Sequence, residues 1–302
     1  MADFFSSGGL WRDEVLVSVT LDPEERTTIS NPEPYFCLVP RVSYFPLVLP
    51  EIERYFRALL PAGTTFDATK DLPWLEVQGQ PLRWQHPVGC LYDLYTAGKA
   101  DVSAPLPLVL HLRKFPTATI IPMHSPEAVR AEFMQMVKEA TFLRDGNIKA
   151  VNSLVKEQTE QIIAAMTNRD YALFERLTEA FRGQEPLRFP IRVHLPGTTH
   201  VQLPILAAEM PAECTLGDVM ARLLPTLFPS PAPAEGSPAV VAFGAALPLS
   251  TPVGWLLRRM AYPDQFLHLA VPQLPPGAPP CPTRPRCPPS SGPPPHRPPR
   301  RG

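Results

Sequence analysis

The chain has 302 residues, a net charge of −1 and 44% hydrophobic residues, which is enough for about two globular domains with cores of their own. Proline accounts for 42 residues, well above the usual ~5%, and 13 of these lie in residues 274–302. This segment has five arginines and no acidic residue, so we expect a disordered Pro-rich tail that leaves the rest of the chain acidic. An acidic body argues against binding nucleic acid through a broad basic face.

Several other classes of protein are disfavoured. No window approaches the ~18 uninterrupted apolar residues of a membrane span, and residues 1–14 lack the features of a secretory signal, so the expected location is cytoplasmic. The five cysteines are odd in number and never spaced as Cys-x-x-Cys, which predicts neither a disulfide framework nor a zinc site.

Signals of catalysis are also missing from the sequence. The seven histidines are scattered, and we expect structural roles for His86, His111 and His268 rather than metal binding or catalysis. No nucleophile motif, phosphate-binding glycine loop or carboxylate pair is present. We therefore predict no metal, no cofactor and no enzyme activity for the chain on its own.

In chain order, the first part has the pattern β-β-α-β-β-α-β. Alternating apolar residues predict strands at 15–20 and 35–42, and a 3.6-residue apolar period predicts a helix at 50–60. A hairpin is expected at 74–77 and 82–84, a short helix at 88–95 and a last strand at 106–112.

The middle part contains no strand pattern and is predicted to be helical. Ser125 followed by Pro126 is typical of a helix start, and Gly146 of its end. Further apolar stripes predict helical stretches at 148–166 and at 171–181, the last closed by Gly183.

The last part repeats the pattern of the first. Strands are predicted at 187–193, 201–206, 240–243, 247–249 and 266–271, with one helix after Pro252 and another at Thr215, which Asp218 would cap reciprocally. Two landmarks recur: Pro-Val-Gly-x-Leu at 87–91 and 252–256, offset by 165 residues, and Leu-Leu-Pro at 59–61 and 223–225, offset by 164.

Two β-grasp domains of ubiquitin-like order bury these apolar faces most simply, because one helix laid across a mixed sheet covers them. We therefore predict an α+β fold. Two ubiquitin-like domains, at 1–116 with an N-terminal extension and at 185–273, flank a helix-rich region at 117–184, and the disordered Pro/Arg-rich tail follows at 274–302.

One lysine stands out on the helix predicted from Pro126. The apolar residues of this helix fall within one narrow arc, namely Val129, Phe133, Met136, Val137, Ala140 and Leu143. Lys138 lies opposite that arc, so its amine is expected in water, and no acidic residue stands three or four positions away to pair with it. By itself such a lysine is most often a solubilising surface charge.

The chain resembles the autophagy-related protein 5 family over about residues 10–273. Five segments carry the resemblance: 33–44, 81–89, 132–140, 214–218 and 262–269. Each is modest alone, but five in the same order on a doubled ubiquitin-like layout are specific.

The resemblance implies a non-catalytic scaffold of autophagy. In the family, the lysine of the Phe-Met-x-x-x-Lys-Glu-Ala segment, here Lys138, receives the C-terminal glycine of the ubiquitin-like autophagy-related protein 12 as an isopeptide. With the coiled-coil autophagy-related protein 16, the conjugate acts like a ubiquitin ligase. It works with the conjugating enzyme, autophagy-related protein 3, to promote lipidation of autophagy-related protein 8 with phosphatidylethanolamine. The implied location is the cytoplasm, with peripheral contact at the preautophagosomal and phagophore membrane.

The sequence leaves three alternatives open. The first is a scaffold of the same fold that binds its partners only non-covalently and forms no isopeptide. The second is a thioester transferase that uses Cys90 or Cys37. The third is a ubiquitin-like donor that is itself attached through its terminal Gly302.

The groove for the coiled-coil partner is not located by the sequence. Trp11, Trp84 and Trp255 are candidates because tryptophan is favoured at binding hot spots, although tryptophan is more often a core residue.

Overall fold

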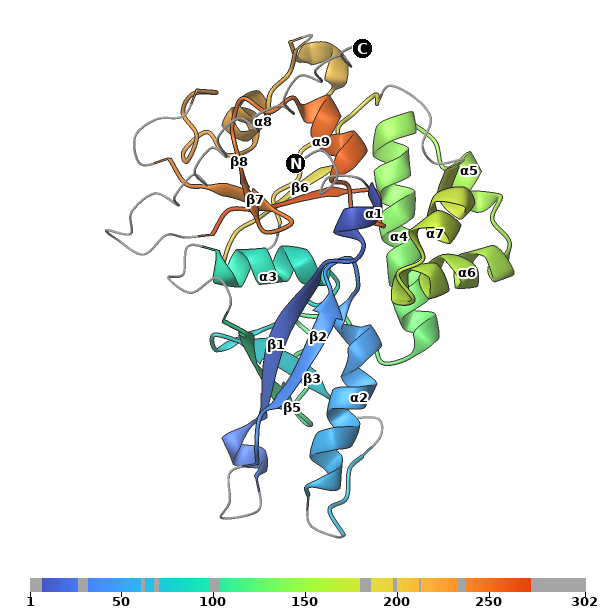
Figure 1. The fold of residues 1–302 in the computed structure, drawn as a ribbon, viewed down its shortest axis with the longest axis vertical. Helices are drawn as coiled ribbons and strands as arrows, with labels where there is room; N and C mark the ends of the chain where they lie inside the picture. Colours follow the sequence, from blue (N-terminus) through green and yellow to red (C-terminus); the bar gives the residue numbers. More distant parts are fainter. Residues whose placement is uncertain are drawn as a thin grey trace, which may run out of the picture.

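A computed structural model describes residues 7–26, 32–60, 63–67, 71–97, 104–179, 186–197, 200–211, 213–232 and 237–272. Two β-sheets belong to the first and last parts of the chain, and a group of helices lies to one side of them (Figure 1). The predicted Pro-rich tail and the predicted helix stop at Gly183 lie outside the described residues.

The N-terminal domain holds a sheet of five strands in the order β2-β1-β5-β3-β4. Its strands are β1 (Glu14–Leu21), β2 (Tyr35–Pro40), β3 (Trp74–Val77), β4 (Gln80–Pro81) and β5 (Leu106–His111), and its helices are α2 (Phe45–Ala58) and α3 (Val88–Thr96). β1 and β5 run parallel, and the other neighbours are antiparallel.

Two predicted bounds in this domain are wrong. Helix α2 begins at Phe45 rather than at residue 50, because its buried face extends upstream through Phe45 and Leu49 and keeps Pro50 inside the helix. The second hairpin strand lies at 80–81 rather than 82–84. Gln78 and Gly79 both have positive φ, 52° and 78°, which makes a tight two-residue turn.

The C-terminal domain repeats this architecture with one strand fewer. It contains β6 (Ile191–His194), β7 (Val240–Ala242), β8 (Ala245–Leu247) and β9 (Leu267–Ala270) in the order β6-β9-β7-β8, with helices α8 (Leu216–Leu223) and α9 (Val253–Arg259). β6 and β9 are parallel, like β1 and β5. The repeated Pro-Val-Gly segments play the same part in both domains, since Pro87 and Pro252 directly precede α3 and α9.

The strand predicted at 201–206 is not formed. Val201 and Leu206 make isolated bridges to Val193 and Arg188 instead. Pro204 has no N–H to donate to a ladder, which accounts for the interruption between the two bridges.

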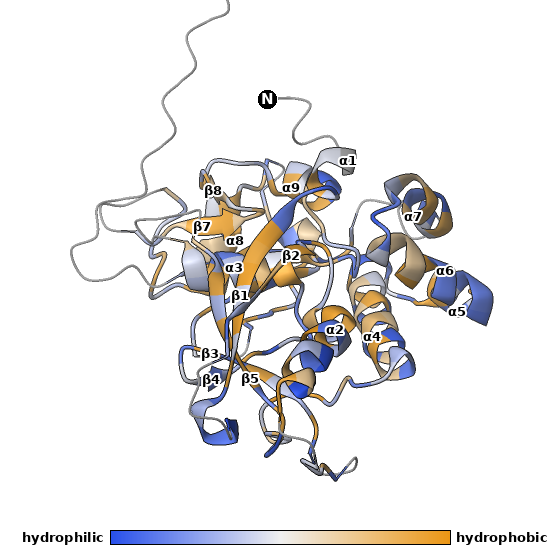
Figure 2. Ribbon diagram, turned by 60° about the horizontal axis from the view of Figure 1, so that its bottom comes forward, coloured by the Kyte–Doolittle hydropathy of each residue, from blue (hydrophilic) through white to orange (hydrophobic). Residues whose placement is uncertain are grey.

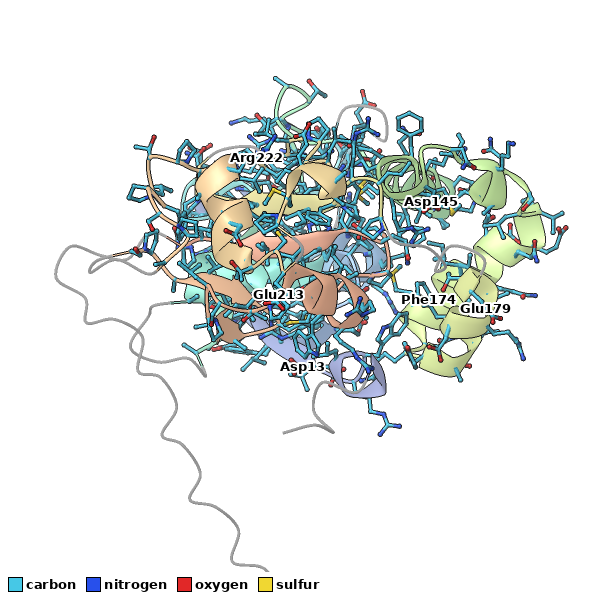
Figure 3. The ribbon with its side chains drawn as sticks, turned by 90° about the horizontal axis from the view of Figure 1, so that it is seen from above. Asp13, Asp145, Phe174, Glu179, Glu213 and Arg222 are labelled. Carbon is cyan, nitrogen blue, oxygen red and sulfur yellow. The ribbon has the colours of Figure 1, made fainter. Side chains whose placement is uncertain are left out.

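The helical region consists of α4 (Pro126–Asp145), α5 (Lys149–Asn152), α6 (Lys156–Thr167) and α7 (Tyr171–Thr178), and the short α1 (Ser7–Leu10) packs beside α7. Viewed from above, this region lies beside the C-terminal domain, with Asp145 and Phe174 on one side and Arg222 on the other (Figure 3). Hydrophilic colour gathers around α5 and α6, whereas β1 and β7 are mostly hydrophobic (Figure 2).

The two domains meet at α3, which lies between the two sheets (Figure 1). Leu91 of α3 belongs to the core of the N-terminal domain, whereas Leu94 packs with Val241 and Ala270 of the C-terminal sheet. The predicted α+β fold, two ubiquitin-like sheets and a helix-rich region, is therefore confirmed. Among the described residues, no helix is long and apolar enough to cross a membrane.

Candidate functional site

Helix α4 has the ends that its sequence predicts. The Ser125 hydroxyl accepts a hydrogen bond from the Ala128 N–H at 3.1 Å, Pro126 occupies the first turn, and Gly146 ends the helix in the left-handed conformation with φ 71°. The helix contributes to both large cores: Val129 packs with the N-terminal domain, and Phe133 and Met136 pack with the C-terminal one. It is therefore held rigidly between them.

Lys138 lies on the side of α4 away from its buried face and is half-buried. Of its neighbours one turn away, Gln135 and Phe142 are exposed, Phe142 by 53%, whereas Met134 is half-buried and Thr141 is buried. Within the part of the chain that the structure describes, the side chain of Lys138 takes part in no hydrogen bond or ion pair. Its amine is therefore not engaged by a carboxylate there.

The next residue, Glu139, fastens this turn of α4 to the C-terminal domain. Its carboxylate accepts hydrogen bonds from Arg192 Nη2 and Gln202 Nε2, both at 2.7 Å. The side chain of Arg192 is only 6% exposed and its guanidinium lies 3.8 Å from the centre of the Phe266 ring. These bonds direct the Glu139 side chain toward the C-terminal domain, and Lys138 lies about 100° around the helix from it.

The tryptophan candidates for a partner groove have different surroundings. Trp84 is 0% exposed and donates its indole N–H to the Ile121 carbonyl at 2.8 Å, so its prediction as a groove residue is corrected to a core role. Trp11 is 6% exposed and packs against Phe174 with ring centres 4.6 Å apart, which makes it a link between the N-terminal segment and α7. Trp255 is half-buried on α9 and stays a prediction.

The cysteines considered as thioester carriers are poorly placed for that chemistry. Burial raises the pKa of the Cys37 thiol to about 11, with a further contribution from Glu51. Cys90 is buried, and its pKa lies well above the usual range for the same main reason. Since the thiolate is the nucleophile, neither residue is activated.

Three histidines that are far apart in the sequence lie close together at the domain junction. His86 precedes α3, His194 ends β6 and His268 lies on β9, and one ring nitrogen of each lies within 4.8 Å of the others. No spacing rule points to this group, because its members come from three separate segments. The parallel pairing of β6 with β9 places two of them, His194 and His268, on neighbouring strands.

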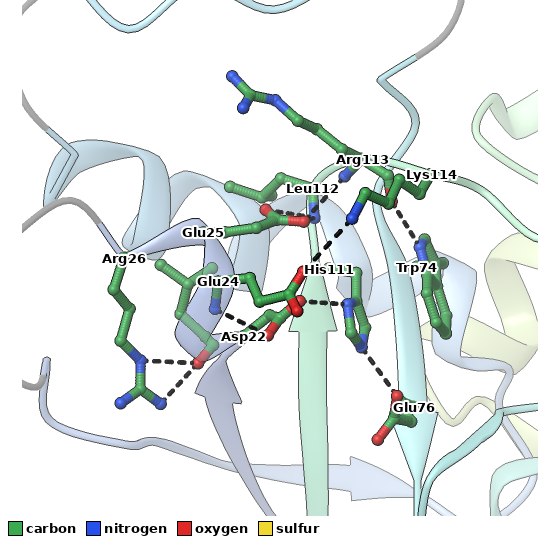
Figure 4. Close-up of polar contacts among 11 residues, drawn as sticks. Asp22, Glu24, Glu25, Arg26, Trp74, Glu76, His111, Leu112, Arg113 and Lys114 are labelled. Carbon is green, nitrogen blue, oxygen red and sulfur yellow. Dashed lines mark hydrogen bonds and ion pairs between the residues drawn. The ribbon is translucent and has the colours of Figure 1, made fainter.

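A second group forms at the far end of the N-terminal sheet (Figure 4). His111 lies between two carboxylates, with Nδ1 2.9 Å from Asp22 and Nε2 3.1 Å from Glu76, and it stacks on Trp74. The Glu25 carboxylate accepts hydrogen bonds from the backbone N–H groups of Leu112 and Arg113. The polar atoms of this group are thus paired with one another, and we interpret the group as a structural one at the end of the sheet.

Comparison with known proteins gives consistent matches along the chain. Family models described as "Autophagy protein ATG5" match residues 10–112 as the UblA domain, 126–182 as the alpha-helical bundle region and 188–271 as the UblB domain.

Whole-length relatives agree. "Autophagy protein 5" of Phaeosphaeria nodorum is 30% identical over 298 residues, covering 87% of this chain and 94% of the relative. The protein of the same name from Aspergillus oryzae is 30% identical over 312 residues, covering 87% and 95%. The crystal structure of Kluyveromyces marxianus Atg5 superposes with a TM-score of 0.73 at 17% identity, over 90% of this chain and 100% of that one, which supports the fold. The chain therefore belongs to the autophagy protein 5 family.

Proposed function

We propose that this chain is an autophagy scaffold that accepts the C-terminal glycine of autophagy-related protein 12 on Lys138 through an isopeptide bond. Family membership supports the role in autophagy. The observation that carries the residue assignment is the environment of Lys138. Its amine has no ion-pair partner among the described residues, and the helix that presents it is fixed to both domains.

The proposed reaction is an acyl transfer. The neutral lysine amine attacks the carbonyl carbon of the donor's thioester, the carbon–sulfur bond breaks, and the carrier's cysteine leaves as thiolate while the amine proton passes to a base. Lysine amines are mostly protonated at neutral pH, so the conjugating enzyme supplies both the base and the orientation. An arginine in the same place cannot react, because its guanidinium stays protonated.

The surroundings of Lys138 suit a reaction with another protein. Phe142, one helical turn further on, is 53% exposed and offers an apolar contact beside the amine. The Glu139 clamp holds the backbone in place during attack. An acceptor fixed on a packed helix loses little conformational freedom when the carrier docks.

The further roles in this proposal follow the family. The conjugate binds the coiled-coil autophagy-related protein 16 and, through autophagy-related protein 3, promotes lipidation of autophagy-related protein 8. It acts from the cytoplasm at the preautophagosomal and phagophore membrane, and the chain alone carries no catalysis. For the groove of the coiled-coil partner, Trp255 is the tryptophan candidate that keeps exposed surface.

The test compares Lys138→Arg with Lys149→Arg in cells that contain the donor protein. Lys149 is an exposed lysine of the same helical region and serves as the matched control. On a denaturing gel, we expect a band heavier by one ubiquitin-like protein for the wild type and for Lys149→Arg, and none for Lys138→Arg. An adduct that persists in Lys138→Arg contradicts the acceptor assignment. A wild type that never forms an adduct but co-purifies with the donor supports the non-covalent alternative instead.

A further inference from the structure

The histidines at the domain junction form a compact, buried nitrogen cluster. His86, His194 and His268 are 4%, 3% and 1% exposed. They come from both ubiquitin-like domains, His86 from the N-terminal one and the other two from the C-terminal sheet. Three imidazoles from separate segments meeting inside a protein need an explanation, because buried polar atoms normally have hydrogen-bond partners.

Hydrogen bonds orient only part of this cluster. His268 Nε2 lies 2.9 Å from Asp264 Oδ2, so the carboxylate accepts the Nε2 proton and leaves a lone pair on His268 Nδ1. That nitrogen lies 2.8 Å from His194 Nε2. A carboxylate behind a histidine whose other nitrogen faces inward is the arrangement that commonly supports a metal-ligating histidine.

His86 completes the cluster and has one ring nitrogen without a partner among the described residues. Its Nδ1 is buried and has no hydrogen bond within the described part of the chain. An imidazole nitrogen that has no hydrogen-bond partner can offer its lone pair to a metal ion.

Charge at the junction suits an added cation. The Asp264 carboxylate is fully buried beside His268, and the charge of nearby Arg192 is already paired with Glu139 at 2.7 Å. His200 is half-buried, and its ring centre lies 5.5 Å from that of His86, which places a further imidazole at the side of the cluster.

We propose that His86, His194 and His268 bind a divalent transition-metal ion of the zinc class and thereby tie the two ubiquitin-like domains together. Ligand atoms around a tetrahedral zinc ion lie about 3.3 Å apart when each Zn–N bond is about 2.0–2.1 Å. The three ring nitrogens already lie within 4.8 Å of one another, so small ring movements complete the set. His194 then carries its proton on Nδ1, and His200 or a water molecule takes the fourth position.

The experiment uses the full-length chain after treatment with a chelator. Zinc is titrated in competition with a chromophoric chelator, and cobalt(II) is added separately to record the visible absorption of a tetrahedral site. We expect one equivalent of either metal per chain. His86→Gln should weaken zinc binding by about tenfold or more, in line with the loss of one ligand. His111→Gln, in the separate cluster of Figure 4, should leave binding unchanged.

Three results would overturn the proposal. In the first, the wild type binds no zinc. In the second, His111→Gln loses zinc binding while His86→Gln keeps it. In the third, His86→Gln and His111→Gln lose zinc binding to the same extent. If His86→Gln fails to fold, X-ray absorption of the zinc-loaded wild type decides. At least three imidazole nitrogens are expected, whereas sulfur ligands would place the ion on cysteines and contradict the assignment. The proposal does not depend on conjugation at Lys138.

Discussion

Lys138 and Glu139 are adjacent residues whose side chains have different surroundings. Glu139 accepts hydrogen bonds from Arg192 and Gln202, whereas the side chain of Lys138 has no partner among the residues described. A lysine that formed an ion pair would have to break it before reacting. The contacts of Glu139 with Arg192 and Gln202 therefore hold the helix in place and do not involve the Lys138 amine.

Replacing Glu139 with Ala should destabilise the protein measurably. The change leaves the nearly buried Arg192 guanidinium without its carboxylate, which costs about 1–3 kcal/mol. The free energy of unfolding in urea measures the loss. Glu24→Ala is the control, because the Glu24–Lys114 pair is exposed on both sides and its removal should change stability little. Equal effects of the two changes would show that the Arg192 clamp is not a structural anchor.

The thiol of Cys37 should respond to pH as a buried group. Its pKa is raised to about 11, so at pH 8 only about one thiol in a thousand is ionised, and the thiolate fraction rises about tenfold per pH unit until pH approaches 11. Alkylation by iodoacetamide, followed by mass spectrometry of the native protein, should show this rise for Cys37 and no labelling of buried Cys90. Rapid labelling of either residue at neutral pH would restore the thioester transferase as an alternative.

At the scale of elements, α3 is the joint between the two sheets. The Asp93 carboxylate on α3 is 2% exposed and accepts hydrogen bonds from Arg41 Nη1 at 2.7 Å and from the Gly244 N–H, across the domain boundary, at 3.1 Å. Arg41 also pairs with Asp13 at 2.7 Å. One carboxylate thus connects a helix of the first domain to the β7–β8 turn of the second.

Asp93→Asn should weaken this joint. The amide keeps the shape of the side chain but removes the charge that faces Arg41, and we expect a loss of about 2 kcal/mol because Asp13 still balances part of the guanidinium charge. Thermal unfolding followed by far-UV circular dichroism measures the change. A melting temperature equal to that of the wild type would mean that the Asp93 contacts do not hold the domains together.

The elements differ in how far the sequence predicts them. The reciprocal cap of Thr215 and Asp218 was predictable, because both partners lie within four residues, and the structure shows the Thr215 N–H donating to Asp218 Oδ2 at 2.8 Å. The extra turns of α2 before Pro50 were not predictable, because proline normally marks a helix start and only tertiary burial of Phe45 outweighs that preference. The histidine cluster was missed for a related reason, since it exists only after two domains have packed.

At the scale of the whole molecule, two β-grasp domains both pack against α4, the helix that carries Lys138. The α4 helix contributes Val129 to one core and Phe133 to the other, so the position of Lys138 depends on both domains and on the contact between them. The repeat and the helix face were predictable from periodicity. The role proposed for Lys138 rests on the family resemblance, because a lysine on an exposed helix face is usually no more than a surface charge.

Mass spectrometry of tryptic peptides from the chain purified from cells tests the acceptor assignment most directly. The account predicts a branched peptide in which the C-terminal glycine of the donor is joined to Nζ of Lys138, and unbranched peptides at Lys149 and Lys156. A branch on another lysine, with unmodified Lys138 in the same conjugate, would contradict it.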